Sequence, residues 1–265
     1  MIVIGERING MFTDVKNAIR KKNKEVVQKL ALDEIEAGAN ILDVNVGTAS
    51  ASPGRAMAWL VKTIEEVTDT QLSLDSTRLE VIKAGLDAVS NPPMINSTQA
   101  DPERLAEYLQ LAIENDASLI ALTMDARGVP QDTDRRVELA GMIVMTAMEM
   151  GYPVEKLFID PIIQPVKFAQ TQVNFVLESI SQIRLLSDPA PHFVVGLSNV
   201  SQGTEDRELI NRTCLVMCIA MGLDAAIMDP FDKEMMDAMI TAELLLNKQI
   251  YSDSFLAAYR SSVKK

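Results

Sequence analysis

Short apolar runs alternate with longer amphipathic segments along the whole chain, and this alternation constrains the fold more than any other feature. The apolar runs predict strands at residues 2–5, 40–45, 72–75, 93–96, 118–124, 157–160, 194–197 and 225–228. Helical patterns follow them at residues 24–37, 54–67, 78–89, 102–115, 133–150, 171–186, 206–221 and 232–247. Strands that alternate with helices form a parallel sheet. Eight such units in roughly 250 residues predict a (β/α)8 barrel, as a single domain over residues 1–265.

A doubly wound open sheet is the alternative fold, but the turn after the first predicted strand has no GxGxxG fingerprint to support it. Helix-end signals agree with the barrel. Asp101 and Pro102 suit the start of a helix, and Gly38, Gly151 and Gly222 suit left-handed positions just past helix ends. The tail, residues 250–265, keeps aromatic and aliphatic side chains, so we expect it to pack on the barrel or on a second subunit.

Composition narrows the class of protein. An apolar content of 48% allows a large core, and the formal charge of −12 argues against a nucleic-acid surface, which needs clustered Lys and Arg. No apolar segment reaches the roughly 20 residues that span a bilayer, and the N-terminus lacks the pattern of a signal peptide. The only two cysteines, Cys214 and Cys218, lie one helical turn apart. We therefore expect a reduced, cytoplasmic protein without disulfides.

Nearly every predicted strand ends in an acid or an amide. In a barrel of this kind the active site lies at the carboxyl ends of the strands, so these side chains should meet at one mouth. An amide donates and accepts hydrogen bonds, whereas a carboxylate only accepts them. This mixture suits a flat heterocycle with amino, imino and oxo groups, such as an aminopyrimidine. The strand-end residues are Glu6, Asn9, Asp43, Asn45, Asp75, Asn96, Asp125, Asp160, Ser198, Asn199 and Asp229.

The stretch at residues 193–207, FVVGLSNVSQGTEDR, stands out among the strand ends. An apolar, β-branched run predicts a buried strand, and a loop of small neutral side chains follows it before the next helix. Ser198, Asn199, Ser201 and Gln202 lie together in this loop without a charge between them. Neutral hydrogen-bonding groups at the end of a buried strand suit a polar, uncharged ring system.

Other chemistries lack their residues. The only histidine, His192, precedes the predicted seventh strand, at the opposite mouth, so no Ser–His–Asp or Cys–His arrangement is expected. Two cysteines on one helical turn indicate packing rather than a zinc site. A ring of acids holding Mg²⁺, as in enolase-like barrels, is the main alternative on chemistry alone, but no strand end supplies its Lys or His base. We therefore predict no bound metal.

Several short motifs together resemble one family of pterin-binding barrels. They are GERING at residues 5–10, LDVNVG at 42–47, LDST at 74–77, INST at 95–98, IDP at 159–161, GLSNVSQ at 196–202 and INRT at 210–213. In this order and spacing the chain resembles the methyltetrahydrofolate:corrinoid protein methyltransferases over essentially its whole length. These enzymes are related to the folate domain of cobalamin-dependent methionine synthase and more distantly to dihydropteroate synthase.

The resemblance implies a homodimeric barrel that binds tetrahydrofolate or 5-methyltetrahydrofolate at its mouth. It also implies that a methyl group moves between folate N5 and the Co(I) corrinoid, a cobalamin, of a separate corrinoid protein. By this resemblance, Asp75, Asn96 and Asp160 contact the pyrimidine edge, and Gly196 and Ser198 lie along the oxo edge. Asn199 lies next to N5, and Gln202 and Arg207 belong to the same loop and helix start.

The chemistry of the reaction favours Asn199 as the residue beside N5. A methyl group on a tertiary amine is a poor electrophile, so N5 must gain positive character before the methyl group can leave. A hydrogen bond from an amide that strengthens during this change favours the transition state. An amide cannot supply a proton, which must come from solvent or from a nearby carboxyl chain. We assign catalysis to Asn199 and Asp75.

The sequence leaves the direction of transfer open, between acetyl-CoA formation and the demethylation of methoxyaromatics or methylamines such as glycine betaine. Two alternatives to this reading are a dihydropteroate-synthase-like enzyme and a folate-binding module without catalysis. The first needs a basic cluster for pyrophosphate, which the ends of the seventh and eighth predicted strands lack. Asp125 stands where the family leads us to expect an asparagine, so we assign it no contact with the pterin.

Overall fold

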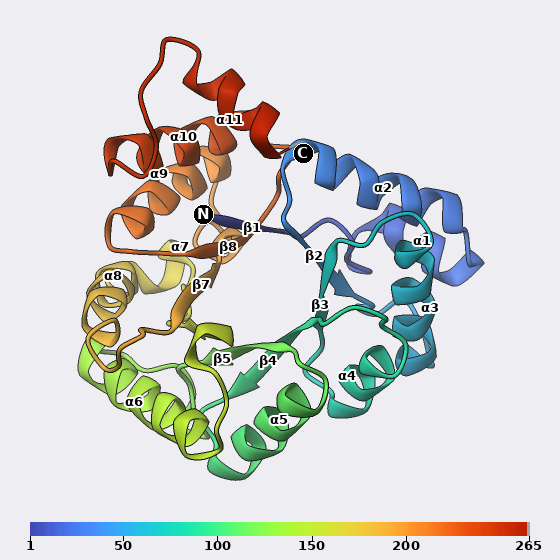
Figure 1. Ribbon diagram of the computed structural model, residues 1–265, viewed down its shortest axis with the longest axis horizontal. Helices are drawn as coiled ribbons and strands as arrows, with labels where there is room; N and C mark the ends of the chain where they lie inside the picture. The colour runs from blue at the N-terminus through green and yellow to red at the C-terminus, as the bar shows by residue number, and fades with distance from the viewer. Residues whose placement is uncertain (264–265) are drawn as a thin grey trace.

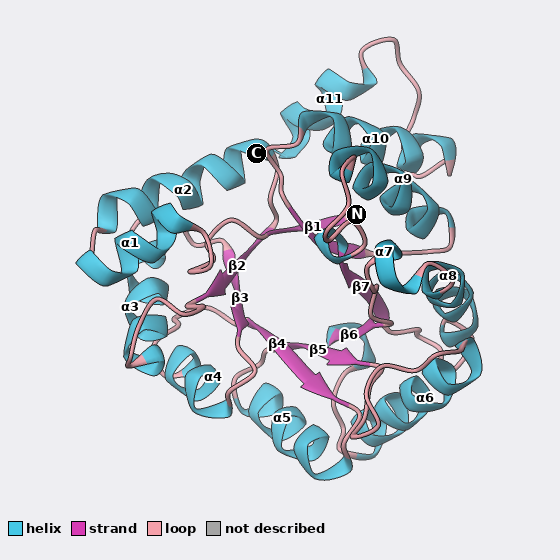
Figure 2. Ribbon diagram, turned by 180° about the vertical axis from the view of Figure 1, so that it is seen from behind, coloured by secondary structure: helices cyan, strands magenta, loops and turns pink. Residues whose placement is uncertain are grey.

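The computed structural model describes residues 1–263 and contains a closed barrel of eight parallel strands. The strands follow their order in the chain, and β1 pairs with β8 to close the ring (Figures 1 and 2). This confirms the predicted (β/α)8 barrel. The strands are β1 (Ile2–Gly5), β2 (Ile41–Asn45), β3 (Gln71–Asp75), β4 (Met94–Gln99), β5 (Ser118–Leu122), β6 (Leu157–Asp160), β7 (His192–Gly196) and β8 (Ala225–Met228).

The helices surround the barrel on its outside (Figure 2). Those predicted from the sequence are α2 (Lys24–Ala37), α3 (Pro53–Glu65), α4 (Leu79–Leu86), α5 (Pro102–Glu114), α6 (Thr133–Glu149), α8 (Gln172–Ile183), α9 (Arg207–Ala220) and α10 (Lys233–Leu245). Three further helices were not predicted: α1 (Thr13–Lys21), α7 (Val166–Ala169) and α11 (Phe255–Val263). The N-cap residue of α1 is Phe12, which makes no side-chain capping bond, so the usual start signal is missing.

Two apolar layers hold the barrel together. One side chain from nearly every strand fills its interior, in a cluster made of Ile4, Ile41, Met94, Ile120, Phe158, Val194 and Ala225. Neighbouring strand residues such as Val3 and Leu42 belong to a second, larger cluster that includes the inner faces of the helices. This alternation follows from the two-residue period of a strand. Polar side chains are therefore left mainly to the strand ends.

The predicted helix-end signals at Asp101, Gly38 and Gly222 agree with the structure, whereas the bounds of several strands and helices differ from the prediction. Asp101 caps α5 by accepting a hydrogen bond from the Arg104 N–H at 2.9 Å. Gly38 and Gly222 have φ of 115° and 106°, in the left-handed region. The seventh strand was predicted at residues 194–197, but β7 begins at His192 and ends at Gly196 because a 3-10 turn, Leu197–Asn199, takes over.

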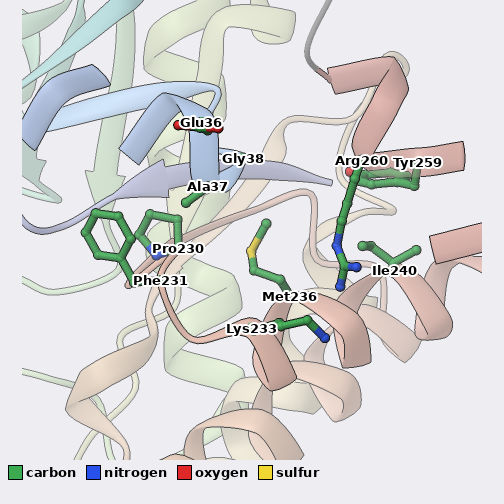
Figure 3. A pocket seen from close by; sticks show the side chains of 10 residues that line it. All are labelled: Glu36, Ala37, Gly38, Pro230, Phe231, Lys233, Met236, Ile240, Tyr259 and Arg260. Atoms are coloured by element: carbon green, nitrogen blue, oxygen red, sulfur yellow. The ribbon is translucent and has the colours of Figure 1, made fainter. Parts of the chain in front are cut away.

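The C-terminal tail folds back on the side of the barrel. Helix α11 contacts α10, and Phe255, Leu256 and Tyr259 pack against the main core cluster. Between α2, α10 and α11 lies a cavity of 350 Å³, and Figure 3 shows the side chains that line it. The last two residues of the predicted tail lie outside the described residues. The homodimer implied by the resemblance stays a prediction.

Within residues 1–263 no helix has both the length and the apolar character needed to cross a membrane. Cys214 and Cys218 are both buried free thiols on α9, and a hydrogen bond joins their sulfur atoms at 4.0 Å. They contribute to the core cluster, which fits their predicted packing role.

We expect Gly10→Ala to destabilise the protein by about 2 kcal/mol or more, because a side chain that overlaps rigid backbone can be accommodated only if the backbone shifts. A Cβ atom at Gly10 would lie 2.0 Å from the carbonyl oxygen of Val46, where only glycine fits. Denaturant unfolding measures the change. Gly141→Ala in α6 is the matched control, since nothing lies within 4 Å of its added Cβ atom. That variant should be stabilised by up to about 1 kcal/mol; equal destabilisation of both would contradict the steric argument.

Candidate active site

A cavity of 930 Å³ opens at the carboxyl ends of the strands. Its lining residues lie in or just after β1, β2, β3, β4, β7 and β8, so side chains far apart in the chain meet there. The carboxyl ends of parallel strands share one end of a barrel, which is why this mouth collects them. The residues predicted for a ring-binding site that line it are Asp75, Asn96, Gly196, Ser198, Asn199 and Arg207.

One wall of the mouth carries acids that are tied to amides and hydroxyls. Asp43 Oδ1 accepts hydrogen bonds from Ser73 Oγ at 2.7 Å and from Asn96 Nδ2 at 3.0 Å. Asp75 Oδ2 accepts one from Asn45 Nδ2 at 2.5 Å. A register shift in β4 after Asn96 marks a bulge, a feature that re-aims side chains next to active sites. These bonds fix the orientation of both carboxyl groups before any ligand enters.

The two acids of this wall also influence each other's protonation. Burial, with the charge of Asp75 as a second cause, raises the pKa of Asp43 well above its ordinary value. Burial also raises the pKa of Asp75, against the hydrogen bond from Asn45. Two desolvated carboxyl groups this close cannot both ionise without a large electrostatic cost. These two carboxyl groups therefore keep a proton more readily than exposed aspartates do.

The opposite wall is neutral and comes from the 3-10 turn after β7. Ser198 donates a hydrogen bond through Oγ to Glu6 Oε1 at 2.6 Å. The amide of Asn199, an exposed residue, makes no hydrogen bond to any residue between 1 and 263. Gly196 leaves room for it, because a Cβ atom there would lie 3.0 Å from Asn199 Nδ2. The Asn199 amide is therefore available to a ligand.

Two charged residues support this neutral wall. Arg207, at the start of α9, donates through Nε to Ser201 Oγ at 3.1 Å and through Nη2 to the Ser198 carbonyl at 3.3 Å. These bonds tie the loop to α9. Burial raises the pKa of Glu6, while the Ser198 hydroxyl opposes that rise. Glu6 is thus an acid that keeps a proton more readily than an exposed glutamate and is bonded directly to the neutral wall.

Two predicted residues do not line the cavity. Asp160 is buried at the end of β6, where its Oδ1 accepts a hydrogen bond from the Ile162 N–H at 2.7 Å. Burial raises its pKa to about 7, against this bond and the charge of Arg136. Gln202 is exposed, and its N–H donates to the Asn199 carbonyl at 3.1 Å. Neither side chain lines the cavity.

A buried arginine supports the segment that follows Asp160. Arg136 of α6 is fully buried and donates to the Pro161 carbonyl at 2.9 Å, to the Asp132 carbonyl at 3.0 Å and to Gln172 Oε1 at 2.5 Å. Its charge is therefore solvated by neutral oxygens rather than by a carboxylate. Such a guanidinium fixes three segments at once. It fixes the chain at Pro161, directly after Asp160.

Asp125 and His192 lie outside the lining of the mouth. Asp125 accepts hydrogen bonds from Arg127 and from Arg135, the latter at 2.6 Å, which occupy its carboxylate. His192 begins β7, at the barrel end opposite the mouth, and stacks on Phe158 with ring centroids 4.9 Å apart. Among residues 1–263 no group of three or more His, Cys, Asp or Glu side chains is arranged to hold a metal ion.

Sequence reasoning missed two residues at or near this site. Asn211 lines the mouth, and its buried Oδ1 accepts no hydrogen bond within the described chain. Its motif INRT was the available signal, but no role was assigned to it. Glu34 of α2 is fully buried under β1, where its Oε1 accepts a hydrogen bond from the Arg7 N–H at 3.0 Å. Nothing in its surroundings in the sequence distinguishes Glu34 from an exposed helical acid.

Comparisons with known proteins agree with this geometry. A family model described as pterin binding enzyme matches residues 10–229. A methylcorrinoid:tetrahydrofolate methyltransferase of Eubacterium limosum is 31% identical over 263 residues, 98% of this chain and 96% of that protein. A methionine synthase of Mycobacterium leprae is 28% identical over 86% of this chain, which spans 20% of the synthase. Dihydropteroate synthase from Xanthomonas albilineans shares the fold, with a TM-score of 0.67 at 17% identity over 92% of this chain and 93% of that one.

We expect the free energy of unfolding to fall less with rising pH in Glu34→Gln than in the wild type. Burial raises the pKa of Glu34 from 4.5 to about 7, so the folded protein binds this proton more tightly than the unfolded chain does. Its contribution is complete below about pH 4.5 and is lost as the pH rises through about 7, an effect of about 3 kcal/mol. Denaturant unfolding of wild type and variant at several pH values measures the difference between their slopes.

The control for this experiment is Glu25→Gln, which changes an exposed acid on the same helix. It should leave the pH dependence of the free energy of unfolding as in the wild type. If the free energy of unfolding depended on pH in the same way in wild type and Glu34→Gln, the pKa of Glu34 would not differ between the folded and unfolded states, and the prediction would be wrong.

Proposed function

Because this chain belongs to the pterin-binding enzymes, we propose that it transfers a methyl group between N5 of tetrahydrofolate and the corrinoid of a partner protein. The observation that carries the proposal is the pairing of two unlike walls in one mouth: acids bonded to amides at Asp43, Asp75 and Asn96, and neutral groups at Ser198 and Asn199. The Eubacterium limosum relative, a methylcorrinoid:tetrahydrofolate methyltransferase, supports the same reaction.

The acid wall suits the aminopyrimidine edge of a pterin. A carboxylate accepts paired hydrogen bonds from adjacent ring and amino N–H groups, and these charge-assisted bonds are stronger than neutral ones. Asp75 and Asn96 both reach the cavity, and their partners hold them in place. Their role is to bind the ring and fix its orientation, so that N5 faces the neutral wall. Orientation of this kind is a major source of rate in group transfer.

The neutral wall suits the reacting nitrogen. As the bond between N5 and the methyl carbon breaks, the electron pair of that bond stays on N5, which takes up a proton. The Asn199 amide is free to form a hydrogen bond that strengthens during this change. Glu6, whose pKa burial raises, is bonded to this wall through Ser198 and can store the proton. The partner's corrinoid supplies the cobalt that takes or gives the methyl group.

The rim of the mouth suits a bulky partner. Phe12 and Phe231 line the cavity and are partly exposed, and Met11 beside Phe12 is 66% exposed. Leu209, in the first turn of α9, is 58% exposed. Exposed apolar side chains around a cleft mark interaction surfaces. We propose that the corrinoid protein docks on this rim, above the folate.

The activity itself can be tested with free cobalamin. Mixing the protein with methyltetrahydrofolate and Co(I) cobalamin should produce the absorbance of methylcobalamin, and methylcobalamin with tetrahydrofolate should give the reverse change. Absence of both would contradict the proposal. Binding of methyltetrahydrofolate without either change would instead indicate a folate-binding module.

Asn199→Ala should lower the rate of methyl transfer by about 100-fold while changing the affinity for folate little. A hydrogen bond that acts mainly in the transition state affects kcat and kcat/KM together. Stopped-flow absorbance measures the rate, and titration of methyltetrahydrofolate measures its Kd. Equal losses in rate and affinity would show uniform binding and would remove Asn199 from its proposed role.

Asp75→Ala should chiefly weaken folate binding, by about tenfold or more, because a buried charge-assisted bond to the ring is lost. Calorimetric titration of methyltetrahydrofolate measures the Kd. Asp125→Ala is the matched control, since this acid also follows a strand but lies outside the cavity lining and binds arginines instead. An unchanged Kd in Asp75→Ala would refute the assignment of the acid wall to the pyrimidine edge.

A further inference from the structure

A second cavity, of 450 Å³, lies beside the barrel between the end of α1, the loop before α3 and the first turns of α3. Arg20 and Lys22 line it from the α1 side, and Arg55 and Trp59 line it from α3. Three cationic side chains and one aromatic ring thus share one hollow, which we term the basic pocket. It has no part in the reaction proposed for the mouth.

The cations of the basic pocket are not neutralised by the protein. None of Arg20, Lys22 and Arg55 forms an ion pair with a carboxylate among residues 1–263. Arg20 donates only to the Ala49 carbonyl, at 3.3 Å, and Arg55 only to the Ser52 hydroxyl, at 2.8 Å. Their charges are therefore available.

This clustering is unusual for an acidic chain. The protein has 37 acids against 25 Lys and Arg, so carboxylates are plentiful, yet within residues 1–263 none pairs with these three residues. Lys16, one turn before Arg20 on α1, lies outside the pocket lining and, among residues 1–263, bonds only to the Thr48 hydroxyl, at 3.2 Å. Like charges one helical turn apart destabilise a helix. A bound anion would remove that cost.

Other donors belong to residues at the same hollow. Ser52, which lines it, is the N-cap residue of α3 but makes no side-chain capping bond, so the first-turn N–H groups have no side-chain cap. Trp59 is partly buried, and its indole N–H has no partner within the described residues. An aromatic face offers contact to a flat or apolar part of a ligand.

We propose that the basic pocket binds a small molecule that carries a phosphate or diphosphate group next to an apolar or ring portion. Arginine forks match phosphate oxygens in pairs. Trp59 takes the apolar portion. The lining of the mouth is mainly acidic and includes Asp229, Asp232 and Glu234, so it disfavours a phosphate. The two sites would therefore sort their ligands by charge.

The protein provides its own reporter for this site, because Trp59 is its only tryptophan. Titration of the full chain with inorganic pyrophosphate, followed by tryptophan fluorescence at constant ionic strength, should give a saturable change. Arg55→Gln should raise the Kd for pyrophosphate about tenfold, as expected for the loss of one charge-assisted bond. Arg20→Gln is a second variant with the same expectation, in case the first does not fold.

Lys62→Gln is the matched control, because Lys62 is an exposed cation on the same helix that lies outside the pocket lining and forms no ion pair in the described part of the chain. It should leave the Kd unchanged. No saturable change, or an equal change of Kd in Arg55→Gln and Lys62→Gln, would overturn the proposal. The readout does not depend on methyl transfer, so its failure is distinct from a failure of the function proposed for the mouth.

Discussion

Pairing of β1 with β8 is the interaction on which the rest of the structure depends. The two strands are in register from Ile2 with Ala225 to Gly5 with Met228, and they close the sheet without an exposed edge. Because the sheet is closed, the residue after β1 lies next to the residues after β7. Glu6 therefore bonds to Ser198 although 192 positions separate them in the chain. Without that closure the two walls of the mouth would not face each other.

A closed ring also removes water from the acids at its end. Burial is the largest cause of the raised pKa of Glu6, Asp43, Asp75 and Asp160. The same desolvation acts on Glu34, which reaches under β1 from α2. Such groups reduce stability at higher pH but keep protons near the chemistry. The raised pKa values thus link the stability of the barrel to its proposed reaction.

Charge is distributed unevenly around this barrel. The mouth collects acids and amides, which suit N–H donors on a neutral ring, whereas the basic pocket beside α1 and α3 collects unpaired cations. Net charge alone, at −12, gives no hint of the second region. Local arrangement rather than composition decides which ligands each region can hold.

The sequence by itself determined the barrel, because eight alternating units leave few other ways to bury their apolar faces. It also determined that the polar strand ends share one mouth, since parallel strands end together. The tertiary structure decided the partners of these side chains. It joined Asp43 to Asn96, and it turned Asp160 toward the Ile162 N–H rather than into the cavity. It also buried Glu34. These outcomes depend on packing between distant segments, which local patterns do not encode.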